Sequence, residues 1–168
     1  MKVFKRIFVF LLIISLSFIP FAVYSETVSA REIEELSHNF FRLHIRANSD
    51  SEEDQALKLK VRDDILEYTT NLLSSCSDKT EAMRLVSANT EKIEQIAKKR
   101  ILAEGYGYGV RASVRREYFE RREYDGFFLP AGEYDSLIVE LGSGQGHNWW
   151  CVMYPNLCFA NSMYEVDA

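Results

Sequence analysis

The chain has 168 residues and a formal net charge of −5, with only three prolines and eight glycines. This size and composition fit one compact domain with a sizeable core rather than a linker or a repeat array. The negative charge argues against nucleic-acid binding, because a protein that binds phosphates needs a basic surface.

The first 25 residues have the order of a secretory signal peptide. Lys2, Lys5 and Arg6 come first, an uncharged run from Ile7 to Val23 follows, and small residues lie near Ser25. The apolar run is also close to the length of a membrane span. We therefore expect residues 1–25 to be a signal peptide or an N-terminal membrane anchor, and residues 28–168 to form one secreted domain. Loss of the three leader cations would change the net charge from −5 to −8.

After a short predicted helix over residues 31–37, the run FFRLHIRAN alternates between apolar and polar residues. One side is apolar, and the other side carries Arg42, His44 and Arg46. A period of two predicts a strand, here with a single buried face.

Two helical regions are predicted next. Asp50 and Glu53 are spaced like a helix start, since an acidic cap and an acidic first turn suit the positive end of a helix. This helix should run to about Leu73, with an apolar stripe made by Leu57, Val61, Ile65, Tyr68 and Leu72. Asp78 and Glu81 repeat the capping pattern and predict a second region, divided in two near residues 88–90 and ended by Gly105.

From Tyr106 the pattern changes to a period of two, which predicts a long strand with Val110, Ala112 and Val114 on one face. Turn signals at residues 125–126 and 130–132 precede a further strand over residues 134–141. The glycine-rich connection after it fits a hairpin that needs positive φ angles, returning as a strand over residues 148–154. A phosphate-binding loop is disfavoured there, because no helix follows the glycines.

This order of elements predicts an α+β fold. We expect a mostly antiparallel sheet of four to five strands, arranged as a meander, with two or three helices packed on one face. The place of the first strand in that sheet is not fixed by the sequence.

The cysteines leave two readings open. Cys151 and Cys158 are too far apart for a zinc knuckle and no second pair exists, so no metal site is expected. In an exported protein they can form a disulfide, provided that the loop between them is centred near Tyr154 and Pro155. Two free buried thiols are the other reading, and Cys76 is left over in both.

A second functional class is a cysteine-dependent hydrolase acting on cell-envelope material, with Cys151 as nucleophile and His44 or His147 as base. Cys151 lies in an apolar run, however, where a thiol is usually an inert core residue. No Ser-His-Asp order and no HExxH motif is present, and we expect no cofactor.

The paired tryptophans Trp149 and Trp150 must point to opposite faces if their segment is a strand. One can then belong to the core, while the other is exposed or is covered by a helix or by a partner. Exposed tryptophan is favoured at binding hot spots. A module that binds the cell wall or a membrane surface is therefore a third, weaker hypothesis.

Two long segments resemble the stage II sporulation protein R family of endospore-forming bacteria. The first is FFRLHIRANSDSEEDQALKLKVRDDIL and the second is PAGEYDSLIVELGSGQGHNWWCVMYPNLCF, with the helical stretch and GYGYGV between them in matching order. The resemblance spans residues 40–159, and the tail NSMYEVDA matches nothing in it. It implies a signal rather than an enzyme, and it carries over no catalytic residues.

The resemblance also implies a place and a partner. Members of the family are made in the forespore, exported into the space between the two septal membranes, and trigger a membrane-embedded aspartic protease of the mother cell that processes pro-sigma-E. We therefore expect this chain to be secreted there, or anchored there by its leader. We expect it to bind that protease and to have no small-molecule substrate.

The expected contact surface combines the polar side of the first strand, the turn after it and the glycine-rich connection. Turns held by a rigid sheet often carry function. The alternative is that these residues preserve only the fold, which we favour for Asp50 and Glu53 in their capping role. The residues of this predicted surface are Arg42, His44, Arg46, Asn48, Asp50, His147, Trp149 and Trp150.

Overall fold

The structure is a computed structural model that describes Glu35 and residues 38–124 and 127–158. The predicted leader, most of the predicted helix 31–37 and the turn Asp125-Gly126 lie outside the described residues. The chain divides into two units, Met1–Leu36 and Ser37–Ala168, and the second unit contains all the elements below. Of the helices in the described part, none combines the length and the apolar character that a membrane crossing requires.

The second unit contains helices and strands in the predicted order. In chain order these are β1 (Phe41–Arg46), α2 (Glu52–Leu73), α3 (Lys79–Ala88), α4 (Thr90–Ala103), β2 (Val110–Phe119), β3 (Arg122–Tyr124), β4 (Phe127–Leu129), β5 (Gly132–Leu141) and β6 (Asn148–Tyr154). The predicted division of the second helical region near residues 88–90 is confirmed. The predicted strand from Tyr106 starts later, at Val110, because α4 is followed by an irregular segment in which Gly105 has a φ of 87°.

Four strands form one mixed sheet in the order β2-β5-β1-β6, and β3 and β4 form a separate two-stranded ribbon. β2 pairs antiparallel with β5, and β6 pairs antiparallel with β1. β1 runs parallel to β5, with Leu43 opposite Leu137 and Ile45 opposite Val139. The predicted α+β class and the mostly antiparallel sheet are confirmed.

The predicted meander is wrong, because β1 lies between β5 and β6. The glycine-rich connection therefore passes the end of β1 instead of closing a hairpin. Its predicted positive φ angles are present at Gly142 (58°) and Gly144 (65°). The physical reason for the central place of β1 is that a strand buried on both faces also needs partners for its backbone groups on both edges, and β5 and β6 provide them.

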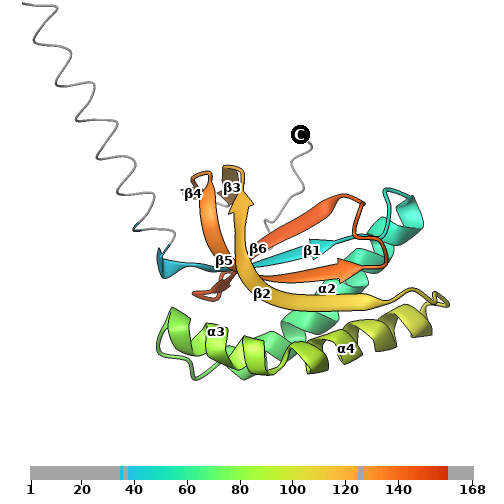
Figure 1. The fold of residues 1–168 in the computed structure, drawn as a ribbon, viewed down its shortest axis with the longest axis horizontal. Coiled ribbons are helices and arrows are strands. Elements are labelled where there is room, and N and C mark those ends of the chain that lie inside the picture. Colours follow the sequence, from blue (N-terminus) through green and yellow to red (C-terminus); the bar gives the residue numbers. More distant parts are fainter. Residues whose placement is uncertain (1–34, 36–37, 125–126, 159–168) are drawn as a thin grey trace, which may run out of the picture. The chain divides into compact units, whose positions relative to one another are not determined.

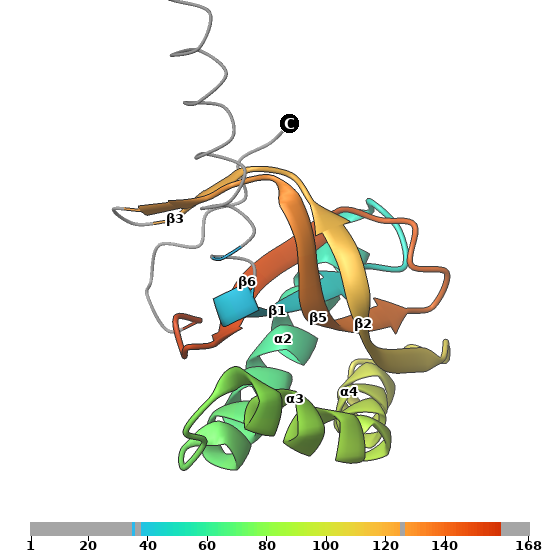
Figure 2. The ribbon, with the colours of Figure 1, turned by 60° about the vertical axis from the view of Figure 1, so that its left-hand side comes forward.

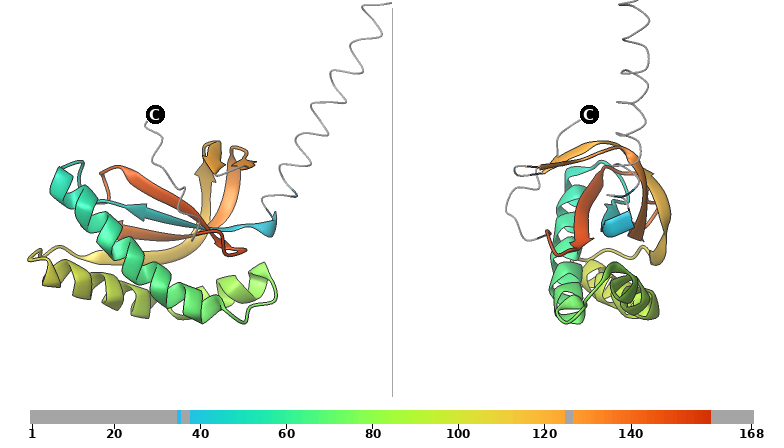
Figure 3. Two further views of the ribbon diagram at one scale, coloured as in Figure 1. Left: turned by 180° about the vertical axis from the view of Figure 1, so that it is seen from behind. Right: turned by 90° about the vertical axis from the view of Figure 1, so that its left-hand side faces the viewer.

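The helices α2, α3 and α4 cover one face of the sheet (Figure 1 and Figure 3). The main core lies between these layers, where the odd-numbered side chains of β1 meet the apolar stripes of the helices. α2 and α4 are joined by Arg100, which donates to both carboxylate oxygens of Asp64 at 2.7 and 2.8 Å. Buried members of this core include Phe41, Leu43, Ile45, Leu57, Val61, Ile65, Ile93, Ile101, Leu137, Val139 and Trp149.

The start of α2 differs from the prediction by one residue. Ser51, not Asp50, is the N-cap, and its hydroxyl accepts a hydrogen bond from the backbone N–H of Asp54 at 3.2 Å. The acids Glu52 and Glu53 then lie in the first turn, where they favour the positive helix end. The Asp78 cap predicted for α3 is confirmed, since its carboxylate accepts from the N–H of Glu81 at 2.9 Å.

The other face of the sheet is also covered, although no helix lies on it. β2 and β5 are long and bend strongly, so that their far ends and the β3–β4 ribbon rise over this face (Figure 2). The predicted single buried face of β1 is therefore wrong: Arg42 is 0% exposed and His44 is 1% exposed. We name this buried polar region, made of Arg42, His44, Glu117, Phe119 and Trp150, the polar face cluster.

Candidate functional site

The predicted surface residues lie in two groups. Arg42, His44, Arg46 and Trp150 belong to or border the polar face cluster, whereas Asn48, Asp50 and His147 lie in two loops at the end of β1. Trp149 belongs to neither group. It is 4% exposed on the helix side, beneath the guanidinium of Arg62, whose carbon lies 5.1 Å from its ring centre.

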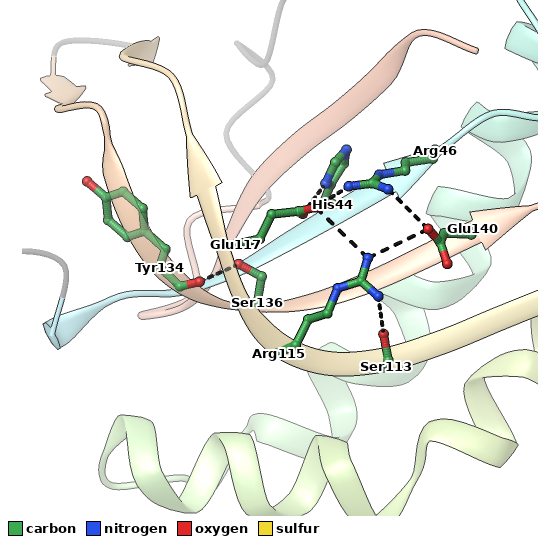
Figure 4. Close-up of polar contacts among 8 residues, drawn as sticks. All are labelled: His44, Arg46, Ser113, Arg115, Glu117, Tyr134, Ser136 and Glu140. Atoms are coloured by element: carbon green, nitrogen blue, oxygen red, sulfur yellow. Dashed lines mark hydrogen bonds and ion pairs between the residues drawn. The ribbon is translucent and has the colours of Figure 1, made fainter. Parts of the chain in front are cut away.

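His44 is the centre of the polar face cluster, and Figure 4 shows its contact with Glu117. Its Nδ1 lies 2.7 Å from the Glu117 carboxylate of β2, and no hydrogen-bond partner of its buried Nε2 is found among the described residues. Burial lowers the pKa of His44 below its ordinary value, although Glu117 and Asn148 act in the opposite direction. The imidazole is therefore held neutral near neutral pH.

Aromatic rings enclose this histidine. Its ring stacks on Trp150 with centroids 3.7 Å apart, and Phe119 meets Trp150 edge to face at 4.8 Å. The guanidinium of Arg42 lies 4.0 Å from the ring centre of Phe119 and 4.9 Å from that of Tyr134, within the range of cation–π contact. These contacts tie β1, β2, β5 and β6 together on the side that has no helix.

Arg46, the next residue on this side of β1, reaches the rim of the cluster. It forms ion pairs with Glu117 and, at 3.1 Å, with Glu140 of β5. Arg115 approaches the same two carboxylates at 4.0 and 3.6 Å (Figure 4). The four side chains thus alternate in charge, and a quarter of the Arg46 side chain is exposed.

The second group is a pair of loops, residues 47–51 and 142–147, which we name the loop unit. Asn48 connects the two loops: its side-chain oxygen accepts from the N–H of Ser143 at 3.0 Å, and its carbonyl accepts from the Ser143 hydroxyl at 2.5 Å. The N–H of Gly146 donates to the carbonyl of Ala47 at 3.0 Å. A Cβ on Gly146 would collide with the Ser49 backbone, so only glycine allows this approach.

Two buried charges support the loop unit from α2. The Asp54 carboxylate accepts hydrogen bonds from Asn48, Ser49 and the Tyr108 hydroxyl at 2.6–2.9 Å. Burial alone would raise the pKa of Asp54, but these hydrogen bonds outweigh it and the pKa lies below its ordinary value. Lys58, which is fully buried, donates to the His147 carbonyl at 3.1 Å.

The exposed tip of the loop unit carries one hydrogen-bonded pair, Asp50 and His147. His147 Nδ1 lies 2.6 Å from the Asp50 carboxylate, which also accepts from the His147 backbone N–H at 2.5 Å. The two side chains are 71% and 57% exposed. The loop unit is therefore well suited to present Asp50 and His147 in one fixed arrangement, because their backbones are held from beneath.

The cysteines are placed as a structural pair. Cys151 and Cys158 are joined by a disulfide with their Cα atoms 5.6 Å apart, and Cys76 is free. Cys151 faces the helices, beside Leu43, whereas His44 faces the polar face cluster beside Trp150. The cysteine–histidine pairing considered for a hydrolase is thus not assembled with His44. Nor do the described residues include three metal-binding side chains grouped around one point.

The sequence patterns missed Asp54, Lys58, Glu117 and Glu140. Glu117 is on the polar side of a predicted strand, but nothing in the sequence says that this side meets β1. Asp54 and Lys58 look like ordinary surface positions of a helix. The carbonyl that Lys58 holds, that of His147, is 89 positions away, and Asp54 holds Asn48 and Ser49 only because the chain turns back over the start of α2. One signal in the sequence could have pointed to Lys58. It is a charged residue that falls within the apolar stripe of α2, where charged side chains are rarely buried without a partner.

Comparisons with known proteins agree with the resemblance seen in the sequence. The model of the family described as stage II sporulation protein R matches residues 37–164. A protein named stage II sporulation protein R from Bacillus subtilis (strain 168) is 37% identical over 118 residues, which cover 70% of this chain and 53% of that protein.

This chain thus spans about half the length of the curated relative that it matches. No solved structure matches it. The matched residues 37–164 include every element of the polar face cluster and of the loop unit. The chain belongs to the stage II sporulation protein R family.

Proposed function

We propose that this chain is a secreted signalling protein of endospore formation that acts by binding and not by catalysis. Its partner is the membrane-embedded aspartic protease of the mother cell, which it triggers to process pro-sigma-E from the space between the two septal membranes. Membership of the family supports the sporulation role. The basic and apolar order of residues 1–25 supports export.

The observation that carries the mechanism is the loop unit. Two segments almost 100 positions apart are fixed to each other by hydrogen bonds at Asn48, Ser143 and Gly146. A surface that is rigid before binding loses little conformational entropy when a partner docks. By favouring the active state of the protease, such a ligand would shift its population toward activity.

The contact surface is therefore narrower than the eight residues named from the sequence. Arg42, His44 and Trp149 are buried and present little or no surface to a partner. Asn48 is occupied by the internal bonds of the loop unit. We assign direct contact to Asp50 and His147, with Arg46 and the half-buried Trp150 as neighbouring members.

Export can be tested by keeping the chain inside the forespore. A variant that lacks residues 1–25 should leave pro-sigma-E unprocessed, because ligand and protease are then separated by a membrane. Processing is followed by immunoblotting of sporulating cells. Normal processing by the retained variant would contradict an extracytoplasmic ligand.

The contact surface can be tested with the double variant Asp50→Ala, His147→Ala in the full chain. We expect processing and co-purification with the protease to fall roughly tenfold, the effect of losing hot-spot contacts, while the amount of exported protein stays unchanged. The matched control is Glu91→Ala with Lys98→Ala, an exposed acid and base on α4. Equal activity of both double variants would remove the loop unit from the contact surface.

A further inference from the structure

The outer edge of β2 offers backbone groups for pairing. β2 is the last strand on its side of the sheet and pairs with β5 from Val110 to Phe119 without a register shift. In an antiparallel pair, alternate residues direct both N–H and C=O away from the partner strand. The N–H of Ala112 donates to the Glu94 carboxylate of α4 at 2.8 Å, so the even-numbered residues face outward.

The helix layer provides a hydrogen-bond partner only in the first half of this edge, at Ala112. Beyond Ala112, the outward groups belong to Val114, Arg116 and Tyr118. In the part of the chain that the structure describes, their outward N–H and C=O groups form no hydrogen bond. On the opposite edge of the sheet, by contrast, the carbonyl of Val152 in β6 accepts from the N–H of Leu157.

The exposed side chains along β2 determine what kind of strand fits there. Arg111, Arg115 and Arg116 are all exposed, and Tyr118 is 58% exposed. Arg115 already approaches Glu117 and Glu140, and the Glu117 carboxylate is taken up by His44 and Arg46, so Arg116 is the main cation at this edge. The Arg116 guanidinium makes a long contact, 3.5 Å, with the carbonyl of Glu133. A second copy of β2 paired edge to edge about Arg116 would place that arginine opposite itself, which is unfavourable, whereas a carboxylate in that position is favourable.

We propose that Val114 to Tyr118 is a docking edge for an extended, acidic segment of a partner protein, which adds to the sheet as a further strand. Main-chain hydrogen bonds to the outward groups provide affinity, and carboxylates beside the arginines provide selectivity. The identity of the natural partner rests on the proposed function, whereas the binding of an acidic strand to this edge does not. The edge is separate from the loop unit.

The direct test uses amide hydrogen exchange on the full-length chain in detergent micelles. The probe is an eight-residue peptide of alternating threonine and glutamate, and the control peptide has lysine in place of glutamate. We expect the acidic peptide to slow exchange of the Arg116 and Tyr118 amides at least fivefold, and the basic peptide to have no effect.

Arg116→Pro provides the matched variant. Proline removes the outward N–H but no bond to β5, and edge strands tolerate proline at such positions. The variant should keep its unfolding midpoint and lose the peptide protection at Tyr118, whereas Arg116→Ala, which retains the N–H, should keep part of it.

Three results would overturn this inference. The acidic peptide gives no protection, or both peptides protect equally, or the outward amides are already protected without peptide. Protection that rises with protein concentration would assign the edge to a second copy, and concentration-independent protection would assign it to another segment of this chain. The proposed function fails separately, if the wild-type chain does not co-purify with the protease while the acidic peptide still binds.

Discussion

His44 illustrates how one residue can connect three strands. It lies on β1, contacts Glu117 of β2 and stacks on Trp150 of β6, while Phe119 packs at its edge. The alternation along β1 places His44 on the polar side of the strand, and polar side chains are usually exposed to solvent. The imidazole is instead buried, because its partners come from strands that curve over it.

The burial of His44 predicts a pH dependence of stability. Its folded pKa lies below the ordinary value of about 6.5, so the unfolded chain takes up the proton first as the pH falls. The free energy of unfolding should therefore decrease from pH 7.5 to pH 5.5. Urea titrations at both pH values measure this decrease.

His44→Gln is the control for that experiment, because it cannot take up the proton. Its overall stability is expected to be lower, but its loss between the two pH values should be clearly smaller. The lowered pKa of Asp54 keeps that group ionised over this range, so Asp54 adds no slope there. An identical pH slope in both proteins would show that His44 is not the titrating group.

At the scale of elements, α2 links the core to the loop unit. Its apolar stripe faces the sheet, and its first turns place Asp54 and Lys58 beneath the two loops. The other helices also make polar contacts with the sheet, α3 through Lys79 to Asp135 of β5 at 2.6 Å and α4 through Glu94 to the edge of β2. The position of the loops thus depends on where α2 begins.

The N-cap of α2 can be tested by comparing neighbouring residues. Ser51→Ala should cost about 1 kcal/mol of unfolding free energy, because the N–H of Asp54 loses its acceptor. Asp50→Ala should cost less, since the exposed Asp50 side chain does not cap the helix. Urea unfolding at pH 7 measures both values, and an unchanged stability of Ser51→Ala would contradict the cap at Ser51.

At the scale of the whole molecule, the two family-like segments form one structural body. β1 from the first segment lies between β5 and β6 from the second, and the loops that follow β1 and β5 dock on each other. The disulfide between Cys151 and Cys158 then joins the middle of β6 to the segment after it. Changes in either segment are therefore expected to affect both.

The disulfide gives a prediction for the molecule as a whole. The double variant Cys151→Ser, Cys158→Ser should lose about 2–3 kcal/mol of unfolding free energy, the amount expected when a short loop is no longer closed. Signalling should persist at temperatures where the variant remains folded. Complete loss of signalling by a folded variant would instead favour the cysteine-dependent hydrolase.

Local patterns were sufficient for much of this fold. The period of two along β1 and β2, the helix boundaries near residues 73, 88 and 105, and the cap at Asp78 all follow from neighbouring residues. These features depend on local hydrogen bonds and on side-chain periodicity, and both are determined by residues that lie a few positions apart in the chain. The cap of α2 was misplaced by one residue, because both Asp50 and Ser51 are suitable caps.

The sequence by itself determined the class of fold, the order of the main elements, and the family, but it did not predict the short strands β3 and β4. Only the tertiary structure decided that β1 is central, that Arg42 and His44 are buried, and that Asp54 and Lys58 hold the loop unit. These facts depend on contacts between residues far apart in the chain. Alternation says which side chains share a face, but what covers that face is fixed by strand order and by the bend of β2 and β5.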